Sequence, residues 1–126
     1  MAETVVKVDL AKYKFVDLPA EDAIRLLEAI TEKLGRESND IRETIRYIRN
    51  FEEFYEYMQK KFKDYIAPPH RPSDYIKDLV VVDKVKLYKR EGERRVVIVF
   101  DRRVSLNVIK EALEDIGYSY RVVKEF

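Results

Sequence analysis

Aromatic residues recur at helical spacing between residues 47 and 66, and their flat rings could stack on other planar groups. At about 100° per residue, nine apolar residues fall within an arc of about 120°, and six of them are aromatic. These residues are Tyr47, Ile48, Phe51, Phe54, Tyr55, Met58, Phe62, Tyr65 and Ile66. Core helices usually rely on Leu, Ile and Ala, whereas a ring face can also stack on a nucleobase. The stripe therefore indicates either an unusual core helix or a stacking surface.

We expect the stripe to be divided between these two roles. Nine exposed apolar residues would promote aggregation, so most of the rings must pack against the rest of the protein. We expect Phe51, Met58 and Phe62, at the centre of the arc, to lie in the core. The residues at its margins are candidates for the wall of an open cleft, because a phenol tolerates partial burial. These marginal residues are Tyr47, Phe54, Tyr55 and Tyr65.

Basic residues are concentrated between residues 84 and 103, where eight Lys or Arg face three acidic residues. Side chains alternate with period two along a strand, so Lys84, Lys86, Tyr88 and Arg90 share one strand face. Cations neutralise phosphates and a ring stacks on a base, which favours contact with a single strand. A charged sheet edge that discourages aggregation is the alternative. The candidate phosphate contacts are Lys61, Lys84, Lys86, Arg90, Arg94 and Arg95, with Tyr88 as the stacking ring of the sheet.

The sequence carries no pattern typical of catalysis, of a metal site or of a cofactor site. Its single histidine, His70, lies in a Pro-rich loop without a neighbouring nucleophile or metal ligand, so we expect an ordinary loop residue. Only three glycines occur, which excludes a Gly-rich phosphate loop. We therefore expect a protein that is not an enzyme and that holds no metal and no cofactor.

Composition sets the frame for these sites. The chain of 126 residues is expected to form a single domain over residues 1–126. Its 25 basic and 24 acidic residues nearly cancel, so attraction for a polyanion must come from local segregation of charge. The absence of Cys, of a long apolar run and of a signal-peptide pattern predicts a cytoplasmic protein without a membrane partner. Few amides and many charged residues are typical of a thermophile.

The first half of the chain is expected to supply a strand region and two helices. Residues 4–10 and 13–18 alternate in polarity and form either one bent strand or a hairpin. Residues 19–35, which begin with Pro and end with Gly, predict a helix. Asp40 and Glu43 have capping-box spacing, and no Gly or Pro follows until residue 68. The simplest interpretation is one helix of about 27 residues, with a break near Asn50 as the alternative.

The second half is expected to form most of the sheet. Residues 79–90 and 94–101 read as a hairpin, with Val82 on the same face as Lys84 and with a return strand that is apolar on both faces and therefore central. Ser105 is a plausible N-cap for a helix through residue 116, and residues 118–124 form a final strand. The predicted fold class is α+β. A small, mostly antiparallel sheet of about four strands is covered by helices, one of them long and aromatic-rich.

Two segments together resemble the ThermoDBP family, a group of single-stranded DNA-binding proteins and relatives from hyperthermophilic archaea. They are YIRNFEEFYEYMQKKF (residues 47–62) and VKLYKREGERRVVIVF (residues 85–100). The resemblance implies an archaeal protein with a small antiparallel sheet and helices, which holds single-stranded DNA in an apolar cleft flanked by basic residues. The founding type of the family forms oligomers through a C-terminal helical zipper. This sequence has no heptad repeat, so we expect a monomer or a homodimer.

The leading hypothesis is a non-enzymatic binder of single-stranded nucleic acid with little sequence preference. Bases would enter a cleft between the long helix and the sheet. The resemblance favours DNA, and RNA stays open because the sequence does not address the 2′-hydroxyl. The alternative is a protein–protein interaction module that uses the aromatic helix as a docking or dimerisation face.

Overall fold

The computed structural model describes residues 2–77 and 79–125, and these form one five-stranded sheet with strand order β3-β4-β2-β1-β5. The strands are β1 (Ala2–Val8), β2 (Lys14–Pro19), β3 (Val82–Arg90), β4 (Glu93–Phe100) and β5 (Tyr118–Lys124). All neighbouring strands are antiparallel except β1 and β5, which run parallel. The α+β class and the mostly antiparallel sheet are confirmed. The sheet has five strands rather than about four because β1 and β2 form a hairpin.

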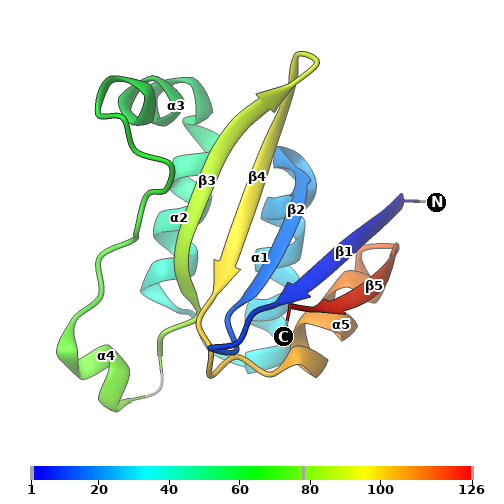
Figure 1. Cartoon of the computed structure of the whole chain (residues 1–126). Helices are drawn as coiled ribbons and strands as arrows, with labels where there is room; N and C mark the ends of the chain where they lie inside the picture. The colour runs from blue at the N-terminus through cyan, green and yellow to red at the C-terminus, as the bar shows by residue number, and fades with distance from the viewer. Residues whose placement is uncertain (1, 78, 126) are drawn as a thin grey trace.

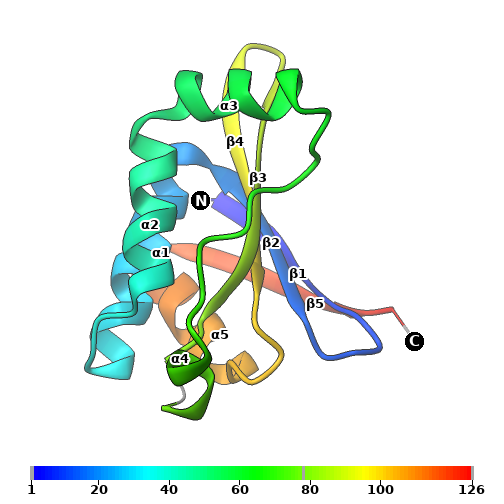
Figure 2. The same ribbon diagram turned by 90° about the vertical axis from the view of Figure 1, so that its left-hand side faces the viewer.

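Five helices accompany the sheet in the described part of the chain. They are α1 (Ala20–Leu34), α2 (Asn39–Arg49), α3 (Phe51–Lys60), α4 (Pro72–Ile76) and α5 (Leu106–Asp115). Helices α1, α2 and α5 lie on one side of the sheet, and no described helix is laid over the opposite side (Figure 1). Helix α3 instead runs across the outer edge of the sheet beside β3 (Figure 2). The sheet therefore has one packed face and one open face.

The hydrophobic core lies between the sheet and the three helices on its packed face. Alternate residues of each strand point into it, because successive side chains of a strand face opposite sides. Its strand members are Val6, Val16, Leu18, Val82, Val85, Leu87, Val96, Ile98 and Phe100, and its helical members include Leu26, Leu27, Ile30, Ile109 and Leu113. Strand β4 lies between β3 and β2, as its two apolar faces indicate.

The expected long helix is wrong, and the alternative break near Asn50 is confirmed. Asn50 leaves the helical region with φ −107° and ψ 44°, and its side-chain amide donates to the carbonyl of Arg46 at 2.9 Å. Asn competes in this way with the helical backbone, so it is a weak helix former. The bend turns α3 toward β3 and buries Phe51 and Met58, each 2% exposed.

The expectation that Val82 shares a face with Lys84 is wrong, because the strand pairing is irregular between these two residues. The pairing of β3 with β4 shifts between Val82 and Lys84, so that Val82 and Val85 are both fully buried. A bulge changes the phase of the strand by one residue. Val82 therefore points into the core, while Lys84 points to the open face.

A buried phenol predicts how stability depends on pH. Tyr118 is 7% exposed and donates to the carboxylate of Asp22, and burial together with this hydrogen bond raises the pKa of Tyr118 to about 12. In the unfolded chain a tyrosine ionises near pH 10. Between pH 10 and 12 the folded state therefore holds more protons than the unfolded state, and the free energy of unfolding falls by about 2 kcal/mol as pH rises.

Urea unfolding of the wild type and of Tyr118→Phe across this pH range measures the effect. The variant lacks the ionisable group and should lose stability less steeply. Tyr57→Phe, a change at an exposed tyrosine, serves as the control and should follow the wild type. Equal slopes for the wild type and Tyr118→Phe would contradict the prediction.

Candidate functional site

The open face of the sheet gathers four of the predicted binding residues. Lys84, Lys86 and Tyr88 stand at alternate positions of β3, and Arg95 lies opposite Tyr88 on β4. The next partners across the sheet are Val97 and Val99 on β4, followed by Asp17 and Phe15 on β2, and of these Val99 is only 1% exposed. On β1, Lys7 lies opposite Phe15. The open face therefore combines apolar side chains with basic side chains on two margins.

A carboxylate holds Tyr88 and Arg95 in place. The Tyr88 hydroxyl donates to Asp17, and Arg95 Nε donates to the other oxygen of the same carboxylate at 3.0 Å. Arg95 also pairs with Glu93, and only 14% of its side chain is exposed. Burial and the hydrogen bond to Asp17 raise the pKa of Tyr88, so it remains a neutral phenol. Arg95 thus orients the ring, and its charge is already balanced by two carboxylates.

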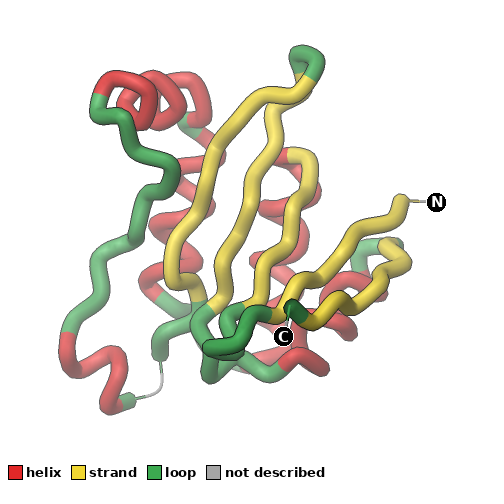
Figure 3. The backbone as a smooth tube through the Cα atoms, in the orientation of Figure 1, coloured by secondary structure: helices red, strands yellow, loops and turns green. Residues whose placement is uncertain are grey.

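The segment after α3 adds Tyr65 to this face. Ile66 pairs with Val85 through two backbone hydrogen bonds of 2.8 and 2.9 Å, so the chain follows the outer edge of β3 (Figure 3). This pairing places the half-buried Tyr65 beside Lys84, whose Nζ lies 4.6 Å from the centre of the ring. The cation and the ring stabilise each other. Tyr65, Lys84, Lys86 and Tyr88 are therefore near neighbours.

The other predicted aromatic residues lie on the packed side of the sheet. Tyr47 is 5% exposed and packs against Phe54, with ring centres 4.7 Å apart. Tyr55 is half-buried and stacks on Phe51, and Lys89 Nζ lies 4.9 Å from the Tyr55 ring centre. These residues adjoin the helix-facing side chains of the β3–β4 hairpin. They do not meet Lys84, Lys86 or Tyr88, which point the other way.

The remaining predicted cations divide in the same manner. Arg94 faces the helices, where it and Lys89 both pair with Glu52 at 2.9 and 3.0 Å. Arg90 is exposed at the tip of the hairpin, and Lys61 is exposed at the end of α3. The eleven predicted residues therefore form no single cleft. Some of them lie on the open face and others on the packed side of the hairpin. Arg90 lies at the tip of the hairpin and Lys61 at the end of α3.

Phe62 overturns an expectation. It was expected in the core, but its side chain is 96% exposed. Helix α3 ends at Lys60, two residues earlier than the aromatic spacing requires, and the chain reverses with φ +52° at Phe62. The spacing of 100° per residue applies only within a helix. Because Phe62 lies beyond the end of α3, this spacing does not predict the direction of its side chain. The flanking lysines at residues 60, 61 and 63 were the only sequence signal of an exposed position.

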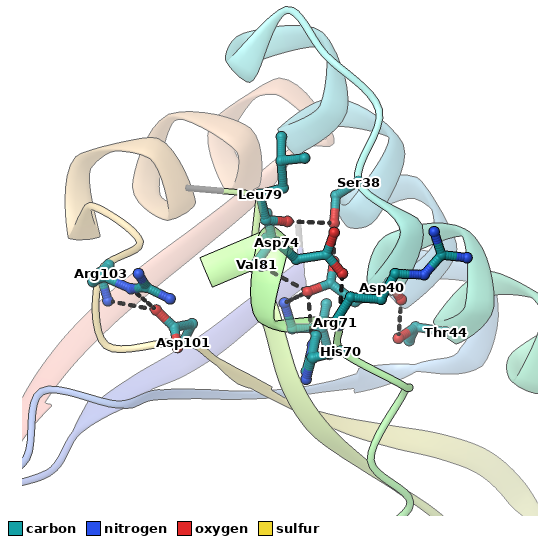
Figure 4. Close-up of polar contacts among 11 residues, drawn as sticks. Ser38, Asp40, Thr44, His70, Arg71, Asp74, Leu79, Val81, Asp101 and Arg103 are labelled. Atoms are coloured by element: carbon teal, nitrogen blue, oxygen red, sulfur yellow. Dashed lines mark hydrogen bonds and ion pairs between the residues drawn. The ribbon is translucent and has the colours of Figure 1, made fainter. Parts of the chain in front are cut away.

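His70 and Asp40 form a buried pair that the sequence did not reveal. His70 Nε2 lies 3.0 Å from Asp40 Oδ2, and the same oxygen accepts the backbone N–H groups of Val81 at 2.7 Å and Val82 at 3.0 Å (Figure 4). The expectation that Asp40 caps the helix is wrong, and His70, expected as an ordinary loop residue, lies in a loop but pairs with Asp40. Ser38 is the N-cap residue, and its hydroxyl donates to Asp40.

This pair anchors the segment that carries Tyr65. Burial raises the pKa of Asp40, while the four hydrogen bonds hold the carboxylate in place. The Ser38 hydroxyl contacts Asp40 and not the imidazole, so these groups do not form a nucleophile–base pair. Asp40 joins α2, the loop before α4 and the start of β3. It thereby fixes the two chain segments on which Tyr65 and Lys84 lie.

Metal ligands, membrane-spanning helices and similarity to known proteins also bear on the function of the site. No group of three or more His, Cys, Asp or Glu in this part of the chain could hold a metal ion. No helix of residues 2–77 or 79–125 is long and apolar enough to cross a membrane. Comparisons with models of protein families, with curated protein sequences and with solved structures found no match for this chain.

The Asp40 network predicts the cost of losing one carboxylate. Asp40→Ala leaves the buried N–H groups of Val81 and Val82 and the imidazole of His70 without an acceptor. An unsatisfied buried donor costs about 1–3 kcal/mol, so we expect the free energy of unfolding to fall by about 3 kcal/mol in total. Urea unfolding at neutral pH measures it. Asp64→Ala, at an exposed loop position, is the control and should change stability by less than about 0.5 kcal/mol. A similarly small change in Asp40→Ala would refute the anchoring role.

Proposed function

We propose that this chain is a non-enzymatic binder of single-stranded nucleic acid, with the strand lying on the open face. One observation carries the proposal. Lys84, Lys86 and Tyr88 point outward at alternate positions of β3, and the Tyr65 ring contacts Lys84. Two cations lie between two rings in this group, and a single strand likewise combines anionic phosphates with flat bases.

The chemistry of the face fits an unpaired strand better than a duplex. Tyr65 and Tyr88 offer rings for base stacking, which requires bases that are not already stacked within a helix. Lys84 and Lys86 would contact phosphates, and Lys7, which lies opposite Phe15 and pairs with Glu125 at 3.9 Å, adds a further cation at this face. Stacking tolerates every base, so we expect little sequence preference. DNA is the ligand that the resemblance to the ThermoDBP family favours, and that resemblance stays a prediction.

The proposed site is smaller than the set predicted from the sequence. Tyr47, Phe54 and Tyr55 lie on the packed side, where their rings contact other side chains. Arg94 is paired there with Glu52. Arg95 belongs to the site as a positioning residue for Tyr88, through Asp17.

A protein-interaction module remains the second candidate function, and a surface groove favours it. A cavity of about 590 Å³ lies between α1 and α2, with Ile41 and Ile45 among its apolar lining. Acidic residues such as Glu28 line its α1 side, and Arg46 and Arg49 line its α2 side. A partner helix with both charges on its flanks would fit such a groove. If the protein binds a partner helix in this groove and has no other function, addition of an oligonucleotide should not affect the residues of the open face.

Salt dependence tests the role of the two lysines. Each phosphate contact on a single strand contributes about 0.7 to the slope of log affinity against log salt. Lys84→Gln/Lys86→Gln should therefore reduce the slope for oligo-dT by about 1.4. Intrinsic tyrosine fluorescence reports the binding, since the chain has no Trp.

The matched control for this double variant is Lys33→Gln/Lys110→Gln, which removes two lysines from α1 and α5 on the packed side. It should keep the wild-type slope. The proposed function would be refuted if the affinity of the wild type for oligo-dT did not depend on salt concentration, or if its affinity for duplex DNA were equal.

Ring substitution tests the stacking role of Tyr88. We expect Tyr88→Ala to weaken oligo-dT binding about tenfold, since one base–ring stack contributes about 1–3 kcal/mol. Tyr88→Phe keeps the ring, loses only the hydrogen bond to Asp17 and should bind nearly as the wild type does. Tyr75→Ala removes an exposed ring of α4 and serves as the control. Equal weakening by the Ala and Phe variants would show that the hydroxyl, and not stacking, matters.

A further inference from the structure

Phe62 is the most exposed large apolar side chain among the described residues. It is 96% accessible to solvent, whereas Tyr65, three residues later, is half-buried and Tyr57, five residues earlier, is 40% exposed. Single exposed apolar residues are common on protein surfaces. The backbone of Phe62 makes it different, because its φ of +52° lies in the left-handed region. A bulky residue in this region is a genuine outlier.

The left-handed backbone closes the C-terminal end of α3, where the N–H of Phe62 donates to the carbonyl of Gln59 at 3.3 Å and the N–H of Lys63 to that of Met58 at 3.0 Å. This motif explains the backbone of Phe62 but not the choice of an exposed phenyl ring there. Left-handed φ values strain an L-residue, and such strain persists where the surrounding structure or a function maintains it. Glycine would relieve the strain, and a polar residue would avoid the exposed ring. The chain nevertheless presents a phenyl ring at a position where no described residue packs on it.

The surroundings of Phe62 are basic. Lys60 and Lys61 precede it and Lys63 follows it, while Asp64 is the only acidic residue from 57 to 66. The ammonium groups of Lys60 and Lys61 have no ion pair or hydrogen bond with any described residue. Lys63 Nζ lies 5.7 Å from the centre of the Tyr57 ring, which is itself 40% exposed. Lysines and aromatic rings are therefore neighbours here, as they are on the open face.

The path of the chain connects Phe62 to the open face. Helix α3 crosses the outer edge of β3, and its C-terminal end lies toward the side of the open face (Figure 2). Three residues beyond Phe62, Tyr65 already contacts Lys84. Along β3, the pair of Tyr65 with Lys84 is followed by the pair of Lys86 with Tyr88, and Phe62 precedes Tyr65 by three residues of chain.

We infer that Phe62 is a stacking ring for an unpaired base, at the end of a track that begins on the open face and passes around the edge of β3. This inference rests on the proposed function and names the residue that extends its site. Lys60 and Lys61 meet the phosphates that flank the stacked base. The exposed ring is accessible to a base without displacement of any described side chain.

A membrane surface fits this feature less well than a base does. Interfacial binding requires an apolar helix face with several bulky residues, whereas the neighbours of Phe62 are Lys61 and Lys63. One ring against one base is a complete contact, and base–aromatic stacking needs no further apolar area. The lipid contact is therefore one outcome of the test and not the proposal.

A tryptophan reporter tests the contact directly. The chain has no Trp, so Phe62→Trp introduces a single indole at this position. Oligo-dT should quench its emission with the same midpoint as the tyrosine signal of the wild type. Ile76→Trp places an indole at another exposed site, 85% accessible and on α4, and should not respond.

Affinity measurements separate the ring from the charges. Phe62→Ala should bind oligo-dT about tenfold more weakly, with an unchanged salt slope, because no cation is lost. Phe62→Gly should weaken binding equally and fold at least as well, because glycine adopts a positive φ without strain. Lys60→Gln/Lys61→Gln should reduce the salt slope by about 1.4.

The outcomes distinguish this inference from the function on which it rests. If oligo-dT binds the wild type and the Phe62→Trp emission stays constant, the inference fails and the proposed function stands. If oligo-dT does not bind the wild type at all, both fail. A response of Phe62→Trp to phosphatidylserine vesicles, with none to oligo-dT, assigns the ring to lipid and overturns the inference.

Discussion

Burial of a single face of the sheet governs the arrangement of this protein. Val16, Val85 and Ile98 come from three neighbouring strands and are at most 1% exposed, because they all point at the helices. A strand that turns alternate side chains inward must turn the others outward. A slip of one residue in register would exchange the two sets, so packing of the core also fixes the outward set. Lys84, Lys86 and Tyr88 are outward for this reason, and the bulge after Val82 sets their phase.

Buried polar groups hold the connecting segments against this core. The carboxylate of Asp40 joins α2 to the start of β3 and to the loop that carries His70. At another corner Lys14 Nζ donates to the carbonyls of Arg102 at 2.8 Å and Val104 at 2.6 Å, and burial lowers its pKa. Each group satisfies backbone atoms that would otherwise be buried without partners. The loops beside the core are thereby held by specific hydrogen bonds as well as by apolar packing.

The partners of the cations distinguish the two sides of the β3–β4 hairpin. On the packed side, Lys89 and Arg94 both contact Glu52, so a carboxylate offsets their charge. On the open face, Lys84 and Lys86 lie against the rings of Tyr65 and Tyr88. A ring stabilises a cation without neutralising it, so Lys84 and Lys86 retain their positive charge, whereas Arg95 on the same face is paired with Asp17 and Glu93. A chain with a net charge of only +1 can present a local basic surface in this way.

Several elements are predicted correctly from signals between residues that are close in the chain. Gly35 ends α1 in the left-handed conformation, and the Ser105 hydroxyl accepts the N–H of Asn107 at the start of α5. The turn at Glu91 and Gly92 and the final strand lie where their residues predict them. These signals depend on residues only a few positions apart, so no knowledge of the chain path is needed.

Which candidate residues lie close together depends on the tertiary structure. Helical spacing placed Phe62 in the core, but the helix ends before it, and the direction of α3 depends on what Phe51 and Met58 can bury against. The pairing of Asp40 with His70 joins residues 30 positions apart. The sequence therefore supplied the rings and cations of the site. Their division between two faces followed from the strand register and from the path of the chain around the edge of β3, which arise from packing between distant segments.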